Sequence, residues 1–129
     1  MNKLEHSAEL AGRILLAAIF LLAGLSKITG YEGTQAYMAS AGVPGMLLPL
    51  VIVLEVGGAL ALIAGFQTRL AALALAGFSL LTAALFHNKL GDQMQFVLFF
   101  KNLAIAGGFL IVAVNGAGAW SLDRKFARS

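Results

Sequence analysis

Four long apolar runs are the feature that most constrains the fold of this chain. They cover residues 10–28, 46–65, 70–87 and 96–115 of a chain of 129 residues. A bilayer core needs about 20 mostly apolar residues per helical span, and each run is close to that length. Only 12% of the residues are charged, against roughly a quarter in soluble domains. The pattern predicts an all-α integral membrane protein in which residues 1–129 form one four-helix bundle domain.

The connection between the first two runs is too polar to cross a membrane. Residues 30–45 read GYEGTQAYMASAGVPG, and Tyr31 and Tyr37 suit the headgroup level, where amphipathic rings partition. Thr34 is a suitable cap for a short helix over residues 35–41, which Gly42 and Pro44 would end. We therefore expect a short interfacial helix that lies flat on the outer face. The connection at residues 65–69 is a tight turn, which makes the second and third helices antiparallel neighbours.

The basic residues predict the orientation. With both termini on one side, that side holds six basic residues and the other holds three, Lys27, Lys89 and Lys101. Basic residues concentrate on the cytoplasmic side of membrane proteins, so we expect both termini in the cytoplasm. Arg13 is then a topology anchor near the cytoplasmic surface. A net charge of +3 spread over membrane flanks does not indicate a nucleic-acid partner, which would need a clustered basic face.

Polar groups from all four helices fall in the outer half of the membrane. Glu55 lies nine residues into the second run, or roughly 13 Å from the outer surface, close to the midplane of a core about 30 Å thick. Lys101 lies roughly 8 Å from the same surface. Lys27 ends the first helix there, and the third ends at His87 and Asn88.

Small residues accompany these charged positions. Residues three or four apart share a helical face, and small residues let membrane helices approach closely. We expect helix contacts at Gly24, Gly57, Gly58 and Gly108. A carboxylate that faces lipid costs several kcal/mol (about 3 on insertion scales). We therefore expect Glu55 to face the bundle interior and to pair with Lys101 or Lys27.

Each of these residues also has a structural interpretation. A buried ion pair at Glu55 can hold helices in register without any ligand. Lys27 can extend its ammonium to the headgroups, and His87 with Asn88 can satisfy the last-turn carbonyls of a helix. A lysine next to Asn102, near one opening of a bundle, suits an anionic or carbonyl-bearing ligand.

The composition leaves few residues for metal or thiol chemistry. The chain has no cysteine, so it cannot form a disulfide or a thiolate-held metal site on its own. His6 and His87 fall on opposite sides of the membrane, and one glutamate with one histidine is too small a ligand set for iron or zinc. We therefore expect no metal and no covalently bound cofactor, and we assign no catalytic residue. A redox role requires a diffusible organic carrier or a cofactor on a partner.

An ordered set of motifs resembles the DoxX family of small bacterial membrane proteins. The motifs are AGLSKITGY, GVPG, LEVGG with GFQTR, FHN, FKNLAIAGG and GAGAWSLD, and they span nearly the whole chain. The resemblance implies a four-helix protein of the bacterial inner membrane, linked in other members to membrane-bound redox and oxidative-stress assemblies. It also marks as motif positions Lys27, Glu55, Lys101, Asn102 and Asp123, with Gly24 and Gly108 as packing positions.

Two hypotheses follow. The first is an accessory subunit of a quinone-linked redox system, not a stand-alone enzyme, with a quinone-like ligand in the outer half of the bundle. Its candidate ligand-binding residues are Glu55, Lys101, Asn102, Lys27, His87, Asn88 and Tyr31. The second is a non-enzymatic scaffold or small transporter whose buried charges are structural or proton-coupled. The expected partners are the lipid bilayer, a redox protein and further copies of the chain.

Overall fold

The computed structural model describes residues 2–87 and 90–128. These residues form six α-helices and one short 3₁₀ helix, with no strand among them. The elements in chain order are α1 (Lys3–Thr29), α2 (Tyr31–Ser40), η1 (Gly45–Leu47), α3 (Leu48–Ala64), α4 (Thr68–Phe86), α5 (Gln93–Asn115) and α6 (Leu122–Arg128). Four segments are long and apolar enough to cross a membrane, namely Lys3–Thr29, Gly45–Ala64, Thr68–Phe86 and Gln93–Asn115. The all-α membrane bundle predicted from the sequence is confirmed.

The outward faces of the long helices are apolar. One side chain from each illustrates this: Leu15 is 74% exposed, Val53 68%, Leu70 67% and Ile111 64%. Contiguous apolar surface of this extent is rare on soluble monomers, but it is favourable against the acyl chains of a bilayer. These faces therefore contact lipid.

Two of the long helices begin at residues that cap them. The Asn2 side chain accepts a hydrogen bond from the Glu5 backbone N–H at 2.9 Å, so α1 starts at residue 3, ahead of the expected membrane span. The Asp92 side chain accepts from the N–H groups of Met94 and Gln95 and starts α5. Side-chain acceptors at this position satisfy N–H groups that have no partner inside the helix.

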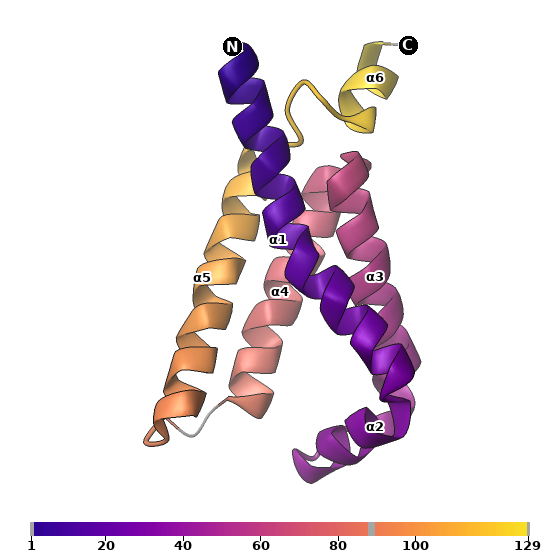
Figure 1. The fold of residues 1–129 in the computed structure, drawn as a ribbon, viewed down its shortest axis with the longest axis vertical. Coiled ribbons are helices and arrows are strands. Elements are labelled where there is room, and N and C mark those ends of the chain that lie inside the picture. Colours follow the sequence, from indigo (N-terminus) through magenta and orange to yellow (C-terminus); the bar gives the residue numbers. More distant parts are fainter. Residues whose placement is uncertain (1, 88–89, 129) are drawn as a thin grey trace.

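The short helix in the first connection is one turn longer at its start than expected. It covers Tyr31–Ser40, and Thr34 lies inside it, where its hydroxyl donates to the Gly30 carbonyl. Thr34 is therefore not the cap. The Gln35 side chain donates to the Gly45 carbonyl at 3.2 Å and so ties α2 to η1. Figure 1 shows α2 at the end of the bundle where α1 ends and α3 begins.

The long helices pack as two pairs, α1 on α3 and α4 on α5, with α3 joining the pairs through α4. Both termini lie at one end of the bundle, here called the terminal end, and α2 lies at the other, the α2 end (Figure 1). The pairs lie close together toward the terminal end and diverge at the α2 end, where α1 runs obliquely away from α5 (Figure 1). The buried core includes Phe20, Leu62, Leu75 and Phe109.

Three of the four glycines expected at helix contacts lie at such contacts. A Cβ placed on Gly24, Gly58 or Gly108 would lie between 2.5 and 3.2 Å from a side chain of a neighbouring helix. Gly57 differs, because an added Cβ there would have nothing within 4 Å and the residue is exposed. Gly57 faces outward because it is one position away from the face that carries Gly58.

Candidate functional site

A cavity of about 490 Å³ occupies the α2 end, where the two helix pairs diverge. Residues of all five helices from α1 to α5 line it, and most of its wall is apolar, with Phe20, Leu54 and Phe78 among the lining residues. Cavities of about 300–1,000 Å³ with apolar walls and a few polar groups are typical of small-molecule sites. The polar side chains that line this one include Lys27, Glu55, His87, Lys101 and Asn102.

Glu55 and Lys27 form an ion pair inside this cavity. The Lys27 Nζ lies 2.7 Å from the Glu55 Oε1, with Glu55 only 3% exposed and Lys27 26% exposed. Gly24, one turn before Lys27, lets α1 approach α3, since a Cβ there would lie 3.3 Å from the Glu55 Cβ. The expectation that Glu55 faces the interior and pairs with a lysine is confirmed, and the partner is Lys27. The distance of 2.7 Å between the Lys27 Nζ and the Glu55 Oε1 is short enough for a charge-assisted hydrogen bond as well as an ion pair.

Asn102 presents an acceptor to the cavity. Its Nδ2 donates to the Ser79 carbonyl at 3.3 Å and to the Thr82 hydroxyl at 3.0 Å. A carbonyl can only accept, so this contact fixes which end of the amide faces α4. In the described part of the chain Oδ1 has no hydrogen-bond donor. The Nδ2 group of Asn102 is thus engaged by α4, and Oδ1 is the end of the amide that is left without a partner there.

Lys101 is the cavity's free cation. Its side chain lines the cavity but is exposed, and no carboxylate of residues 2–87 or 90–128 pairs with it. Lys27 already pairs with Glu55, so the Lys101 ammonium is a cavity cation without a counterion among the described residues.

Of the remaining candidate ligand-binding residues, His87 lines the cavity and Tyr31 does not. His87 lines the cavity, with its Nδ1 3.1 Å from the Gln95 Oε1, which leaves its second ring nitrogen without a partner among the described residues. Tyr31 begins α2 and is not among the lining residues, whereas Tyr37 is, stacked on Phe86 with ring centroids 5.2 Å apart. Asn88 lies outside the described residues. Among those that are described, no three His, Cys, Asp or Glu side chains lie close enough to hold a metal ion.

Arg13, expected as a surface anchor, is instead buried at the terminal end. Its side chain is 3% exposed, and its guanidinium donates to the Leu62 carbonyl at 3.0 Å and to the Trp120 carbonyl. Arg13 therefore ties α1 to the end of α3 and to the segment before α6. No local pattern around Arg13 predicts these contacts, because the two carbonyls are 49 and 107 residues away.

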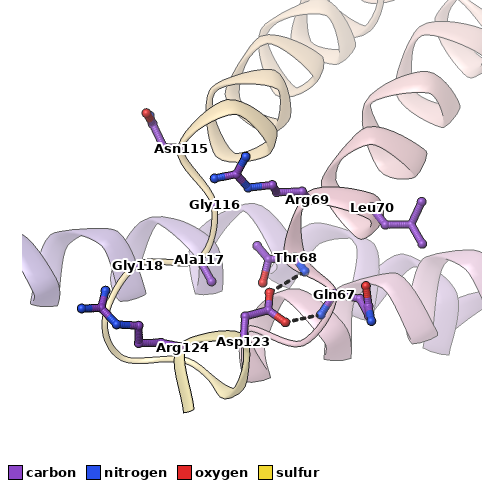
Figure 2. A pocket seen from close by; sticks show the side chains of 10 residues that line it. All are labelled: Gln67, Thr68, Arg69, Leu70, Asn115, Gly116, Ala117, Gly118, Asp123 and Arg124. Carbon is purple, nitrogen blue, oxygen red and sulfur yellow. Dashed lines mark hydrogen bonds between the residues drawn. The ribbon is translucent and has the colours of Figure 1, made fainter. Parts of the chain in front are cut away.

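Asp123 caps α4 from a distant part of the chain. Its two carboxylate oxygens accept from the backbone N–H groups of Gln67 at 2.7 Å and Thr68 at 2.8 Å (Figure 2). Its own N–H donates to the Gly65 carbonyl. Burial acts to raise the pKa of Asp123, but the hydrogen bonds from Thr68 and Gln67 outweigh it and hold the pKa below its usual value. The motif position marked by the family resemblance thus has a structural role here.

The fold and the cavity define a small four-helix integral membrane protein with a polar site inside an apolar chamber. The chain belongs to the DoxX family, whose model matches residues 8–88. That region contains Lys27 and Glu55, while Lys101, Asn102 and Asp123 follow it.

Two Escherichia coli (strain K12) proteins are similar over nearly the whole chain. Inner membrane protein YqjF is 55% identical over 96% of this chain and 95% of its own length. Inner membrane protein YphA is 40% identical over 90% of this chain and 88% of its own length. A Bacillus subtilis (strain 168) protein named "Putative oxidoreductase CatD" is 33% identical over 54% of this chain and 52% of its own length. No solved structure matches the chain.

Proposed function

We propose that this chain is an inner-membrane accessory subunit of a redox or oxidative-stress system and that it binds a quinone-like lipophilic molecule at the α2 end. The observation that carries the proposal is the cavity of about 490 Å³, in which apolar walls surround polar groups of α1, α3 and α5. A quinone likewise combines a polar part, the carbonyls of its ring, with an apolar tail. Both termini lie in the cytoplasm, and the cavity opens toward the periplasm.

The polar groups match the two forms of such a ligand. The Lys101 ammonium donates to a quinone carbonyl, and the Asn102 Oδ1 accepts from the hydroxyl of the reduced form. The Glu55 carboxylate, held by Lys27 at 2.7 Å, is the group suited to take up or release a proton, since quinol chemistry moves protons together with electrons. The electrons come from a redox group of a partner protein.

Relatives support the class of function. YqjF and YphA carry inner-membrane names over nearly the full length of this chain. CatD carries an oxidoreductase name over about half of it. These names favour a redox link in the inner membrane over other uses of a polar cavity.

Quinone binding by the purified protein in detergent micelles tests the proposal. A benzoquinone with a short isoprenoid tail is the probe, and equilibrium dialysis gives its dissociation constant. We expect Glu55→Gln and Lys101→Ala each to weaken binding about tenfold, as for the loss of one hydrogen bond to a charged group. Glu32→Gln and Lys125→Ala are matched controls, because both residues are exposed and neither lines the cavity. Unchanged affinity in both cavity variants removes the proposal.

The second candidate is a scaffold or small transporter. It is favoured by the Lys27–Glu55 pair, in which each charge already has an opposite charge as its neighbour. Co-purification distinguishes the candidates. A stable partner that carries a flavin, haem or metal supports the accessory subunit, whereas substrate uptake that Glu55→Gln abolishes supports a transporter.

A further inference from the structure

A second pocket, of about 370 Å³, lies at the terminal end of the bundle. It is formed by the start of α4, the segment that follows α5 and the start of α6, and it shares no lining residue with the cavity at the α2 end. Figure 2 shows its lining, which includes the side chains of Arg69, Arg124, Asp123 and Leu70.

Arg69 is held in this pocket by packing and not by an acid. A Cβ placed on Gly116 would lie 3.2 Å from the Arg69 Nε and 3.3 Å from its Nη2, so the guanidinium lies directly against the backbone there (Figure 2). Gly116 has a φ of +80°, a conformation that residues with a Cβ rarely adopt. No carboxylate in the described ranges pairs with either Arg69 or Arg124. Two arginine side chains therefore line the pocket with no counterion in the described ranges, and Figure 2 shows the Arg124 guanidinium directed away from that of Arg69.

Asp123 does not serve as a counterion for these arginines. Its two carboxylate oxygens already accept the N–H groups of Gln67 and Thr68, and in doing so they cap the start of α4. Because the Asp123 carboxylate already occupies the N-terminus of α4, the groups of this pocket that can attract an anion are the two arginines. Guanidinium groups present several N–H donors in a plane, which suits the oxygens of a phosphate.

The surroundings indicate where the anion comes from. Leu70 lines the same pocket and is 67% exposed on the lipid-facing side of α4. The pocket therefore lies at the boundary between the apolar surface of the bundle and the polar terminal segments. Six of the nine basic residues belong to the segments at this end, namely Lys3, Arg13, Arg69, Arg124, Lys125 and Arg128.

We propose that this pocket binds the phosphate group of an anionic phospholipid, with Arg69 in place as one ligand, the exposed Arg124 side chain turning inward as the second, and an acyl chain lying along Leu70. Basic pockets beside membrane-spanning helices are recognised sites for anionic headgroups. A free phosphate ion would use the guanidinium groups but would gain nothing from Leu70. The site is independent of the proposed quinone cavity.

Trp120 allows a direct test, because it is the only tryptophan of the chain and lies in the segment between the pocket residues Gly118 and Asp123. The protein in detergent micelles is titrated with phosphatidylglycerol or phosphatidylcholine that carries the same brominated acyl chains, and quenching of Trp120 fluorescence is measured. Each arginine near a headgroup contributes a roughly five-fold preference for the anionic lipid. We therefore expect Trp120 to be quenched at lower concentrations of phosphatidylglycerol than of phosphatidylcholine. The ratio of the two concentrations should fall about five-fold in Arg69→Gln and about five-fold in Arg124→Gln.

Lys125→Gln is the matched control, since Lys125 adjoins Arg124 on α6 but does not line the pocket; its lipid preference should equal that of the unchanged protein. Thermal unfolding of each variant shows whether the fold is retained. Equal quenching by the two lipids, or a preference that survives in Arg69→Gln/Arg124→Gln, overturns the proposal. Inorganic phosphate that abolishes the lipid preference at concentrations where sulfate does not would assign the pocket to a free phosphate ion and would also overturn it.

Discussion

The Nζ of Lys27 lies 2.7 Å from the Oε1 of Glu55, and the two side chains differ sharply in exposure, at 26% and 3%. Both side chains line the cavity, but the carboxylate is almost fully buried where α1 meets α3, whereas the lysine is partly exposed. The two charges therefore depend on each other unequally. Loss of the lysine leaves a buried carboxylate without a counterion, while loss of the glutamate leaves a lysine that can extend toward the headgroups.

This asymmetry predicts unequal costs. We expect Lys27→Met to destabilise the bundle by about 3 kcal/mol, as for a buried ion pair broken on one side. Glu55→Gln should cost about 1 kcal/mol, because an amide can still hydrogen-bond. Unfolding in mixed micelles with increasing denaturing detergent measures both. Equal costs, or a larger cost for Glu55→Gln, would show that the buried carboxylate does not depend on Lys27.

Gly24 predicts a second difference. A Cβ there would lie 2.5 Å from a methyl group of Val56, so Gly24→Ala must push α1 away from α3 and should cost about 1–3 kcal/mol, as overpacking does. Gly57→Ala is the matched control, because a Cβ there meets nothing within 4 Å; it should be neutral or stabilising by up to about 1 kcal/mol through helix propensity. The same unfolding measurement applies. Equal effects of the two changes would contradict the close approach at Gly24.

The Asp123 cap predicts a dependence on pH. The folded state holds the pKa of Asp123 below its usual value, so its stabilisation is complete above the unfolded-state pKa and is lost as the pH falls through the folded-state pKa. Asp123→Ala should lower stability at neutral pH by about 1 kcal/mol, the usual cost of a lost cap. The difference from the unchanged protein should shrink in acid. Thermal unfolding at a series of pH values checks this, and a difference that grows in acid would contradict it.

The orientation can be tested with cysteines, because the chain has none of its own. Glu32 on α2 and Lys125 on α6 are both exposed. We expect a membrane-impermeant maleimide to label Glu32→Cys in intact spheroplasts and to label Lys125→Cys only after the membrane is opened. The reverse pattern would place both termini in the periplasm and the proposed cavity opening on the cytoplasmic side.

Hydropathy alone predicted the four spans, because the bilayer fixes the length of apolar helix that a span requires. Helix α1 extends several residues before the expected span of residues 10–28, and Asn2 followed three residues later by Glu5 resembles a capping pair. That signal was available in the sequence. The extent of α2 was less accessible, because a short polar helix depends on its contacts, such as the one from Gln35 to Gly45.

The site was predictable only in part. Periodicity indicated that Glu55 faces the interior, but the choice of Lys27 over Lys101 depends on how closely α1 approaches α3 at Gly24. The burial of Arg13 depends on carbonyls far along the chain, which no local pattern indicates. Side-chain pairs across helices are set by crossing geometry, and a single sequence does not encode that geometry locally.

Photolabelling tests most directly whether the cavity at the α2 end is a ligand site. An azidoquinone is activated on the protein in lipid nanodiscs, and the labelled positions are mapped by mass spectrometry. Labels should fall on cavity-lining segments of α4 and α5, at residues 78–87 and 101–105, and excess unlabelled quinone and Lys101→Ala should both reduce them. Labels spread over the outward faces, unaffected by competitor, would contradict the account.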